Sequence, residues 1–208
     1  MPSIDQGPPI IHVVDDDNGL RIAMDALFRS VGYQTRNYGS AAEFMEAGAA
    51  DAAGCLVLDV RLPGVSGLDF QSQLVELGVT MPIILMTGHG DIPMTVRGMK
   101  AGAVDFLPKP FREQDMLDAV AAALERDKAT REERAEGDAL QARYDTLSPR
   151  ERDVMGRVAT GKMNKQIAFD IGLSEITVKI HRGNAMRKMG AKTLAAFVRM
   201  AEQLKLDE

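Results

Sequence analysis

The sequence predicts an α/β domain built on a doubly wound, five-stranded parallel sheet, followed by a small all-α domain. Three observations support this prediction. Short apolar runs alternate with stretches of helical spacing from residue 10 to about residue 124. A charged segment with almost no large apolar residue comes next, and four short helical stretches follow it. We therefore expect a first domain over residues 1–124, a charged helical linker over 125–145 and a second domain over 146–208.

The elements of the first domain follow from its apolar pattern. Continuous apolar runs, typical of strands covered on both faces, predict strands at 10–14, 55–58 and 83–86, with a shorter strand at 104–107 and a weaker one at 33–37. Apolar positions at helical spacing predict helices at 20–31, 41–47, 68–77, 94–101 and 114–124. This alternation is typical of a parallel sheet wrapped by helices.

The second domain begins with a clear helix start. Ser148 can accept from exposed amides, Pro149 suits the first helical position, and Glu151 completes a capping box. Helices are then expected at 149–160, 164–170, 175–189 and 193–204. Within the preceding linker, Gly137 weakens the helix, so we expect a bend or a frayed turn there.

Composition and charge restrict the possible functions. With 45% hydrophobic and 26% charged residues in 208, the chain is neither a disordered tail nor a membrane protein. No run is long enough to span a bilayer and no leader precedes the domain, so we expect a cytoplasmic protein. Residues 1–125 carry a net charge of −9 and residues 145–208 a net charge of +4, and a basic segment on an acidic protein suggests a polyanion site.

Reactive side chains follow four of the expected strands. Asp15, Asp16 and Asp17 follow the first, Asp59 the third and Thr87 the fourth, and the fifth leads to Lys109. Ligands of such sheets bind beyond the carboxyl ends of the strands, so these groups should meet at one edge. Three adjacent carboxylates repel one another unless a cation binds them, and oxygen ligands alone favour Mg²⁺. Asp59 would then accept a phosphoryl group as an acyl phosphate.

These residues resemble the receiver domains of two-component response regulators, which have a flavodoxin-like fold. Motifs at 14–16, 58–64, 86–90 and 106–110 match that family in order and spacing. The resemblance implies that Asp59 is the phospho-acceptor, with Thr87 and Lys109 binding the phosphoryl group. It also implies a metal site formed by Asp15, Asp16, Asp59 and the Arg61 carbonyl, and a cis peptide between Lys109 and Pro110. In this family a switch aromatic falls on Phe106, and two residues that tune the lifetime of the acyl phosphate fall on Arg61 and His89.

The second domain contains a helix-turn-helix pattern. Residues 164–168, the turn at 172–174 and residues 177–179 fit two helices joined by a tight turn, an arrangement that lays the second helix in a DNA groove. That helix is basic, and its cations could contact phosphates. The alternative is an ordinary helical hairpin with a solvated face.

Residues 146–204 resemble the LuxR-type DNA-binding domain, and with the receiver the whole chain resembles FixJ-type regulators. In that family the positions of Lys179, Ile180 and Gly183 face base edges. Gly183 has no side chain, so we expect Lys179, with Arg182, to provide most direct readout. The DNA-binding candidates are Asn164, Lys165, Thr177, Lys179, Ile180, Arg182, Gly183, Arg187 and Lys188.

We expect a transcription factor that is phosphorylated on Asp59 by a sensor histidine kinase. Phosphorylation would rotate Phe106 and promote a homodimer through Val96 and Lys100, which in turn would bind promoter DNA and activate transcription with RNA polymerase. The alternative is that phosphorylation releases the DNA-binding domain from the receiver.

Two other function classes are disfavoured. An aspartyl-phosphate hydrolase would need a second Asp two residues after the nucleophile, where this chain has Arg61. We therefore expect no enzyme, only Mg²⁺-dependent self-phosphorylation and slow autodephosphorylation. A scaffold that is never phosphorylated does not fit the complete acidic set. The kinase, the signal, the operator and the regulated genes have no signature in the sequence.

Overall fold

The computed structural model describes residues 7–88 and 92–206. The chain divides into two compact units, Met1–Arg131 and Glu132–Glu208. Each unit has its own hydrophobic core, so each is described by itself. No helix of the described part combines the length and the apolar character needed to cross a membrane.

The first unit is built on a five-stranded parallel sheet with the strand order β2-β1-β3-β4-β5. The strands are β1 Ile10–Val14, β2 Gln34–Tyr38, β3 Gly54–Asp59, β4 Ile83–Thr87 and β5 Asp105–Pro108. Chain order reverses on either side of β1, as it does in doubly wound sheets. The predicted fold class is therefore confirmed, and every predicted strand is present with its ends within one residue of the prediction.

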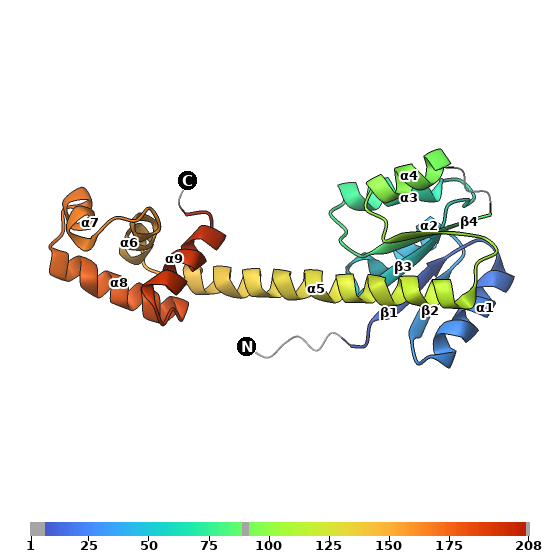
Figure 1. Ribbon diagram of the computed structural model, residues 1–208, viewed down its shortest axis with the longest axis horizontal. Helices are drawn as coiled ribbons and strands as arrows, with labels where there is room; N and C mark the ends of the chain where they lie inside the picture. Colours follow the sequence, from blue (N-terminus) through green and yellow to red (C-terminus); the bar gives the residue numbers. More distant parts are fainter. Residues whose placement is uncertain (1–6, 89–91, 207–208) are drawn as a thin grey trace. The chain divides into compact units, whose positions relative to one another are not determined.

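Helices cover both faces of this sheet (Figure 1). Their bounds are α1 Asn18–Ser30, α2 Ala41–Glu46, α3 Gly67–Glu76, α4 Ile92–Lys100 and α5 Glu113–Asp145, with a short 3-10 turn, η1, at Ala49–Asp51. Phe44, Leu74 and Met94 from α2, α3 and α4 pack with one core cluster. Phe28 from α1 and Met116 from α5 pack with another cluster on the opposite face. The middle strands are thus buried on both sides, which explains their continuous apolar sequences.

Helix α5 extends through the whole segment predicted as a linker. It continues past Gly137, where we expected a bend or a frayed turn, and ends at Asp145. Residues 125–131 belong to the first unit and residues 132–145 to the second. The structure therefore distributes the predicted linker between the two units, because side chains from each half make contacts in the unit to which they belong.

In the first unit, those contacts come from Asp127 and Arg131. Asp127 is 4% exposed and accepts a hydrogen bond of 2.9 Å from the amide of Gly54, at the start of β3. Arg131 forms an ion pair of 2.8 Å with Asp127 and donates to the backbone carbonyls of Asp51 and Ala52. These bonds fix helix α5 to the backbone at the amino end of the sheet.

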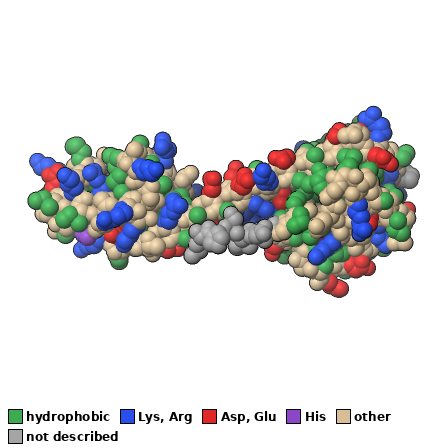
Figure 2. Space-filling view, turned by 90° about the horizontal axis from the view of Figure 1, so that it is seen from below, with side chains coloured by type: hydrophobic (Ala, Val, Ile, Leu, Met, Phe, Trp, Pro, Cys, Tyr) green, Lys and Arg blue, Asp and Glu red, His purple; other side chains and the backbone are tan. Residues whose placement is uncertain are grey.

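The second unit contains α6 Pro149–Ala159, α7 Asn164–Ile171, α8 Glu175–Met189 and α9 Leu194–Gln203. The predicted capping box between Ser148 and Glu151 is confirmed. Gly172 ends α7 with φ 65°, a left-handed conformation that glycine adopts without strain. On the face shown in Figure 2, Lys and Arg side chains (blue) are spread over this unit, and acidic side chains (red) are fewer.

Candidate functional site

The predicted acidic groups meet at the carboxyl edge of the sheet. Asp15 directly follows β1, and Asp59 and Thr87 end β3 and β4. Oxygen atoms of Asp15, Asp16 and Asp59 all lie within 4.8 Å of one another. Asp15 is fully buried and Asp59 is 6% exposed, whereas Asp16 is open to solvent. The parallel strands therefore assemble one acidic pocket from segments that are far apart in the sequence.

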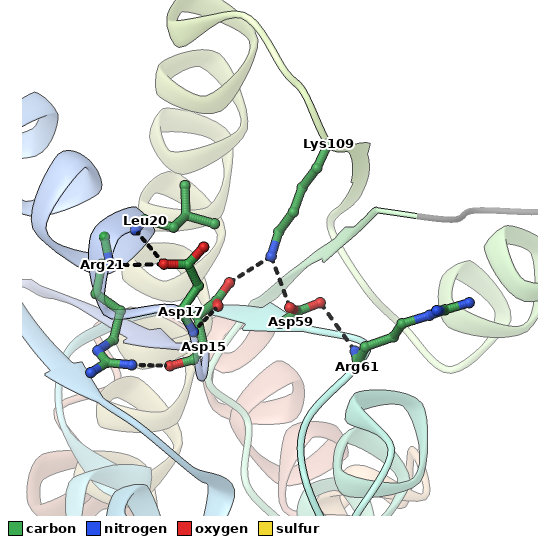
Figure 3. A network of polar contacts seen from close by, with 8 residues as sticks. Asp15, Asp17, Leu20, Arg21, Asp59, Arg61 and Lys109 are labelled. Atoms are coloured by element: carbon green, nitrogen blue, oxygen red, sulfur yellow. Dashed lines mark hydrogen bonds and ion pairs between the residues drawn. The ribbon is translucent and has the colours of Figure 1, made fainter.

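Lys109 joins the two buried carboxylates of this pocket (Figure 3). Its Nζ donates to Oδ2 of Asp15 at 2.7 Å and to Oδ2 of Asp59 at 2.8 Å. The other oxygen of each carboxylate accepts from a backbone amide, that of Asp17 at 2.8 Å or that of Arg61 at 3.0 Å. All four oxygens of these two groups are thus oriented, and Asp59 is held by its own β3–α3 loop.

Burial and ion pairing act in opposite directions on these groups. Burial raises the pKa of Asp15 above its ordinary value, against the hydrogen bond from Lys109, which lowers it. Burial lowers the pKa of Lys109, but its hydrogen bonds to Asp15 and Asp59 raise that pKa by more, so it lies above its usual value. Lys109 therefore remains a cation at neutral pH and offsets part of the negative charge around Asp59.

Two neighbouring residues shape the pocket without being part of its chemistry. Asp17, the last residue of the acidic run after β1, caps helix α1 by accepting from the amides of Gly19 and Leu20, and so has a structural role. Gly67 begins helix α3 against the end of β3. A Cβ at this position would lie 2.2 Å from the backbone carbonyl oxygen of Asp59. Only glycine lets α3 start so close to the predicted phospho-acceptor.

The donor set fits Mg²⁺ better than a softer metal. It consists of carboxylate oxygens from Asp15, Asp16 and Asp59, with no His or Cys among them. Asp16 and Arg61 also line an open cavity of about 480 Å³ beside the carboxylates, which gives a hydrated ion room to enter. The Arg61 carbonyl remains a predicted ligand. The predicted cis peptide between Lys109 and Pro110 is confirmed.

The predicted switch and dimer residues lie near helix α4. Phe106 in β5 is half-buried and packs against the core cluster below α4. Val96 is 44% exposed and Lys100 is also exposed, so both are accessible on α4. Their roles as switch and interface remain predictions. His89, the second predicted lifetime residue, lies outside the described residues.

In the second unit, α7 and α8 form the predicted helix-turn-helix. Lys179 is exposed on α8, and the exposed side chain of Ile180 lies beside it in sequence. A Cβ at Gly183 would meet nothing within 4 Å, so the absence of a side chain leaves open space on this face. Lys165 on α7 is exposed as well. This surface is accessible for binding DNA, with Lys179 as its central cation.

Other predicted DNA contacts have partners within the unit. Nζ of Lys188 forms an ion pair of 2.6 Å with the buried Glu151 and donates to the carbonyl of Thr146 at 3.1 Å. Arg182 is half-buried and donates to Oδ1 of Asn164 at 3.0 Å, which joins α8 to α7. Two further contacts are local: Arg187 donates to Asn184, and the hydroxyls of Thr177 and Ser174 share a hydrogen bond.

Sequence reasoning missed the partners of several of these residues. Glu151 was identified as a capping residue, but nothing in the sequence relates it to Lys188, which lies 37 positions later. Lys188 therefore stabilises the start of α6, and its predicted contact with phosphate competes with this ion pair. The sequence likewise places Asp127 and Arg131 in a charged helical linker and does not reveal their partners, which are backbone groups far away in sequence.

Comparisons with known proteins agree with these two sites. The family model described as "Response regulator receiver domain" matches residues 11–121, and that described as "Bacterial regulatory proteins, luxR family" matches residues 145–201. Nodulation protein W of Bradyrhizobium diazoefficiens is 56% identical over 195 residues, which cover 94% of this chain and 86% of that protein. The transcriptional regulatory protein FixJ of Azorhizobium caulinodans is 44% identical over 192 residues, covering 92% and 90%.

Solved structures show the same organisation. The response regulator StyR matches with a TM-score of 0.85 and 44% identity, covering 95% of this chain and all of that one. Full-length FixJ from B. japonicum matches with a TM-score of 0.57 and 36% identity, covering 96% and 98%. An acidic receiver pocket, a helix-turn-helix and full-length relatives lead to one conclusion: the chain belongs to the FixJ-type response regulators of two-component systems, in which a receiver domain is joined to a LuxR-type DNA-binding domain.

Proposed function

We propose that Asp59 accepts a phosphoryl group from a partner histidine kinase, and that this modification controls promoter binding by the second unit. The observation that supports it best is the position of Asp59, whose carboxylate lies 2.8 Å from the Lys109 ammonium within a cluster of oxygen ligands. An oxygen of Asp59 attacks phosphorus, the bond from phosphorus to the kinase imidazole nitrogen breaks, and an acyl phosphate forms.

The residues around Asp59 suit this transfer. Lys109 moves from neutralising two carboxylates to neutralising the phosphoryl oxygens, and the Thr87 hydroxyl at the end of β4 donates to one of them. Asp15, Asp16 and Asp59, with the Arg61 carbonyl, would hold Mg²⁺, which when bound supplies positive charge to the transferring group.

We infer that the chain does not turn over a separate substrate. A hydrolase would need a second acid two positions after Asp59, and Arg61 stands there. Self-phosphorylation from a small phosphoryl donor and slow loss of the acyl phosphate are the expected reactions, with Arg61 and His89 tuning the lifetime.

Helix α4 and the helix-turn-helix provide the proposed response to phosphorylation, which is dimerisation and DNA binding. We propose that phosphorylation draws Thr87 inward, rotates Phe106 and favours a homodimer in which Val96 and Lys100 lie at the interface. The dimer then binds a symmetric operator in the cytoplasm through the exposed helix α8, and contacts RNA polymerase to activate transcription. Release of the second unit from the receiver is the competing output.

Mass spectrometry tests the modification. Incubation with acetyl phosphate and Mg²⁺ should add about 80 Da to the chain, the mass of one phosphoryl group, and Asp59→Asn should abolish it. Asp69→Asn is a matched control, because Asp69 is an exposed carboxylate of the same unit. Absence of the adduct from the unaltered chain would refute the proposal.

Gel filtration and DNA-binding measurements test whether phosphorylation causes dimerisation and promoter binding. Phosphorylated protein should elute as a dimer and bind promoter fragments more tightly, and Val96→Asp should prevent both effects without preventing phosphorylation. Unchanged elution, with tighter DNA binding after the linker is cut in Asp59→Asn, would favour release instead.

A further inference from the structure

A separate cavity lies at the end of the sheet opposite the acidic pocket. It has a volume of about 310 Å³ and is lined by parts of helices α3 and α5, by the turn that follows α4 and by the segment that enters β4. Ile83, the first residue of β4, lines it, whereas Thr87 at the other end of β4 belongs to the phosphorylation site. Its walls combine polar side chains with apolar ones, among them Val75 of α3 and Val79 of the following loop. This combination is typical of sites for small organic molecules.

One polar side chain in the wall of this cavity is incompletely satisfied. Gln71 is 1% exposed, and its Nε2 donates to the carbonyl oxygen of Gly98 at 3.1 Å. Its Oε1 is buried and has no hydrogen-bond partner among the described residues. A buried acceptor without a donor is unfavourable, and such groups are rare in folded proteins. A ligand that carries an N–H or O–H group would supply the missing donor.

A cation also lines this cavity. Arg126 of helix α5 is exposed and forms no ion pair within the described part of the chain. Thr130, one turn later, lines the cavity as well, but its hydroxyl donates to the backbone carbonyl of Arg126. Because the Arg126 guanidinium has no ion-pair partner in the described part of the chain, it is available for an anionic group.

We propose that this cavity binds a small organic carboxylate that has an apolar body and a hydrogen-bond donor at the far end. The carboxylate would pair with Arg126, the body would lie against Val75, Val79 and Ile83, and the donor would reach Oε1 of Gln71. Each part of the ligand corresponds to a group already present in the walls, and no part of the acidic pocket is needed.

Gln71 connects this cavity with helix α4. Its Nε2 holds Gly98, and a Cβ added at Gly98 would lie 2.5 Å from Leu85 and 3.6 Å from Phe106. Helix α4 thus packs closely on the predicted switch residue at the point where Gln71 holds it. A ligand bonded to Gln71 acts on the helix that carries the proposed dimer surface.

Titration of the ¹⁵N-labelled full chain with 4-hydroxybenzoate tests this site. The probe should shift the Gln71 side-chain amide and saturate with a Kd on the order of 1 mM, as expected for so small a ligand. Benzoate, which lacks the hydroxyl, and phenol, which lacks the carboxylate, should each bind at least several-fold more weakly.

Variants identify the contacts. Arg126→Gln should weaken binding about tenfold, whereas the control Lys128→Gln, an exposed cation of the same helix outside the cavity, should not. Gln71→Met should bind 4-hydroxybenzoate and benzoate equally. Asp59→Asn should bind the probe like the unaltered chain, because the cavity is separate from the acidic pocket. A failure of the phosphorylation proposal can therefore be distinguished from a failure of this one. No saturable shift up to about 10 mM probe, or equal affinities of the Arg126 and Lys128 variants, would overturn the proposal.

Discussion

Asp127→Ala should destabilise the first unit by about 3 kcal/mol, although its sequence context is that of a solvated helix. The substitution removes a charged acceptor from the buried amide of Gly54, and an unsatisfied buried donor costs about 1 to 3 kcal/mol. It also removes the ion-pair partner of Arg131, whose side chain is 26% exposed and which bonds two backbone carbonyls. Because that pair is partly screened, we assign it roughly 1 kcal/mol.

The Gly54 amide has little freedom to find another partner. Gly54 has φ 142°, and a Cβ there would lie 1.8 Å from the carbonyl oxygen of Ile10, so the backbone is tightly packed at this point. Asp127→Asn keeps an acceptor and loses the charge, and should therefore cost less than Asp127→Ala. A loss of about 3 kcal/mol corresponds to a fall of about 10 °C in the thermal midpoint of a unit of this size.

Scanning calorimetry of the full chain measures this effect, with the receiver transition identified by its shift on adding Mg²⁺. Glu125→Ala is the matched control, since it removes an exposed carboxylate from the same helix and should change stability by about 0.5 kcal/mol or less. Equal midpoints for the Asp127 and Glu125 variants would refute the view that α5 is anchored through these bonds.

Three other predictions follow from the structure. Burial raises the pKa of Glu151, but hydrogen bonds from Lys188 and the capping box lower it by more, so its pKa in the folded protein lies below the ordinary 4.5. The ionised carboxylate therefore stabilises the second unit, and this stabilisation should be lost as the pH falls below 4.5. Glu151→Gln should flatten the dependence of its thermal midpoint on pH. Gly67→Ala should reduce acetyl phosphate labelling, measured by mass spectrometry, because its Cβ meets the acceptor backbone, whereas Gly137→Ala, with open space around it, should not. Lys188→Ala should lower the thermal midpoint of the second unit, whereas Lys179→Ala should reduce the salt slope of DNA binding by about 1.

The acidic pocket was predictable because its geometry follows from strand ends. Apolar runs identify the strands, parallel pairing brings their carboxyl ends to one edge, and Asp15 and Asp59 are the next residues along the chain. The approach of α3 to this edge was not predictable. It depends on Gly67, and a glycine near a helix start is also typical of an ordinary turn.

The anchoring of α5 could not be read from the sequence for a different reason. Asp127 and Arg131 are four residues apart, a spacing common to exposed ion pairs of helices. Their partners are backbone groups 73 and 80 positions away, and a backbone amide or carbonyl has no signature in sequence. At Gly137, where we expected a bend or a frayed turn, the helix is continuous, since the helix propensity of the Ala-, Glu- and Arg-rich flanks outweighs a cost of about 1 kcal/mol.

Two cations of helix α8 also differ in a way that the sequence does not reveal. A count of positive charges treats Lys179 and Lys188 alike, but the fold gives Lys188 a buried carboxylate partner and leaves Lys179 exposed on the helix. Transferring Lys188 to a DNA phosphate would leave Glu151 without its cation beside the first turn of α6, which costs stability in the unit that has to bind. Lys179 carries no such cost, so the free energy of phosphate neutralisation at that position contributes fully to affinity. The cations that a fold leaves without internal partners are therefore the better candidates for DNA contacts.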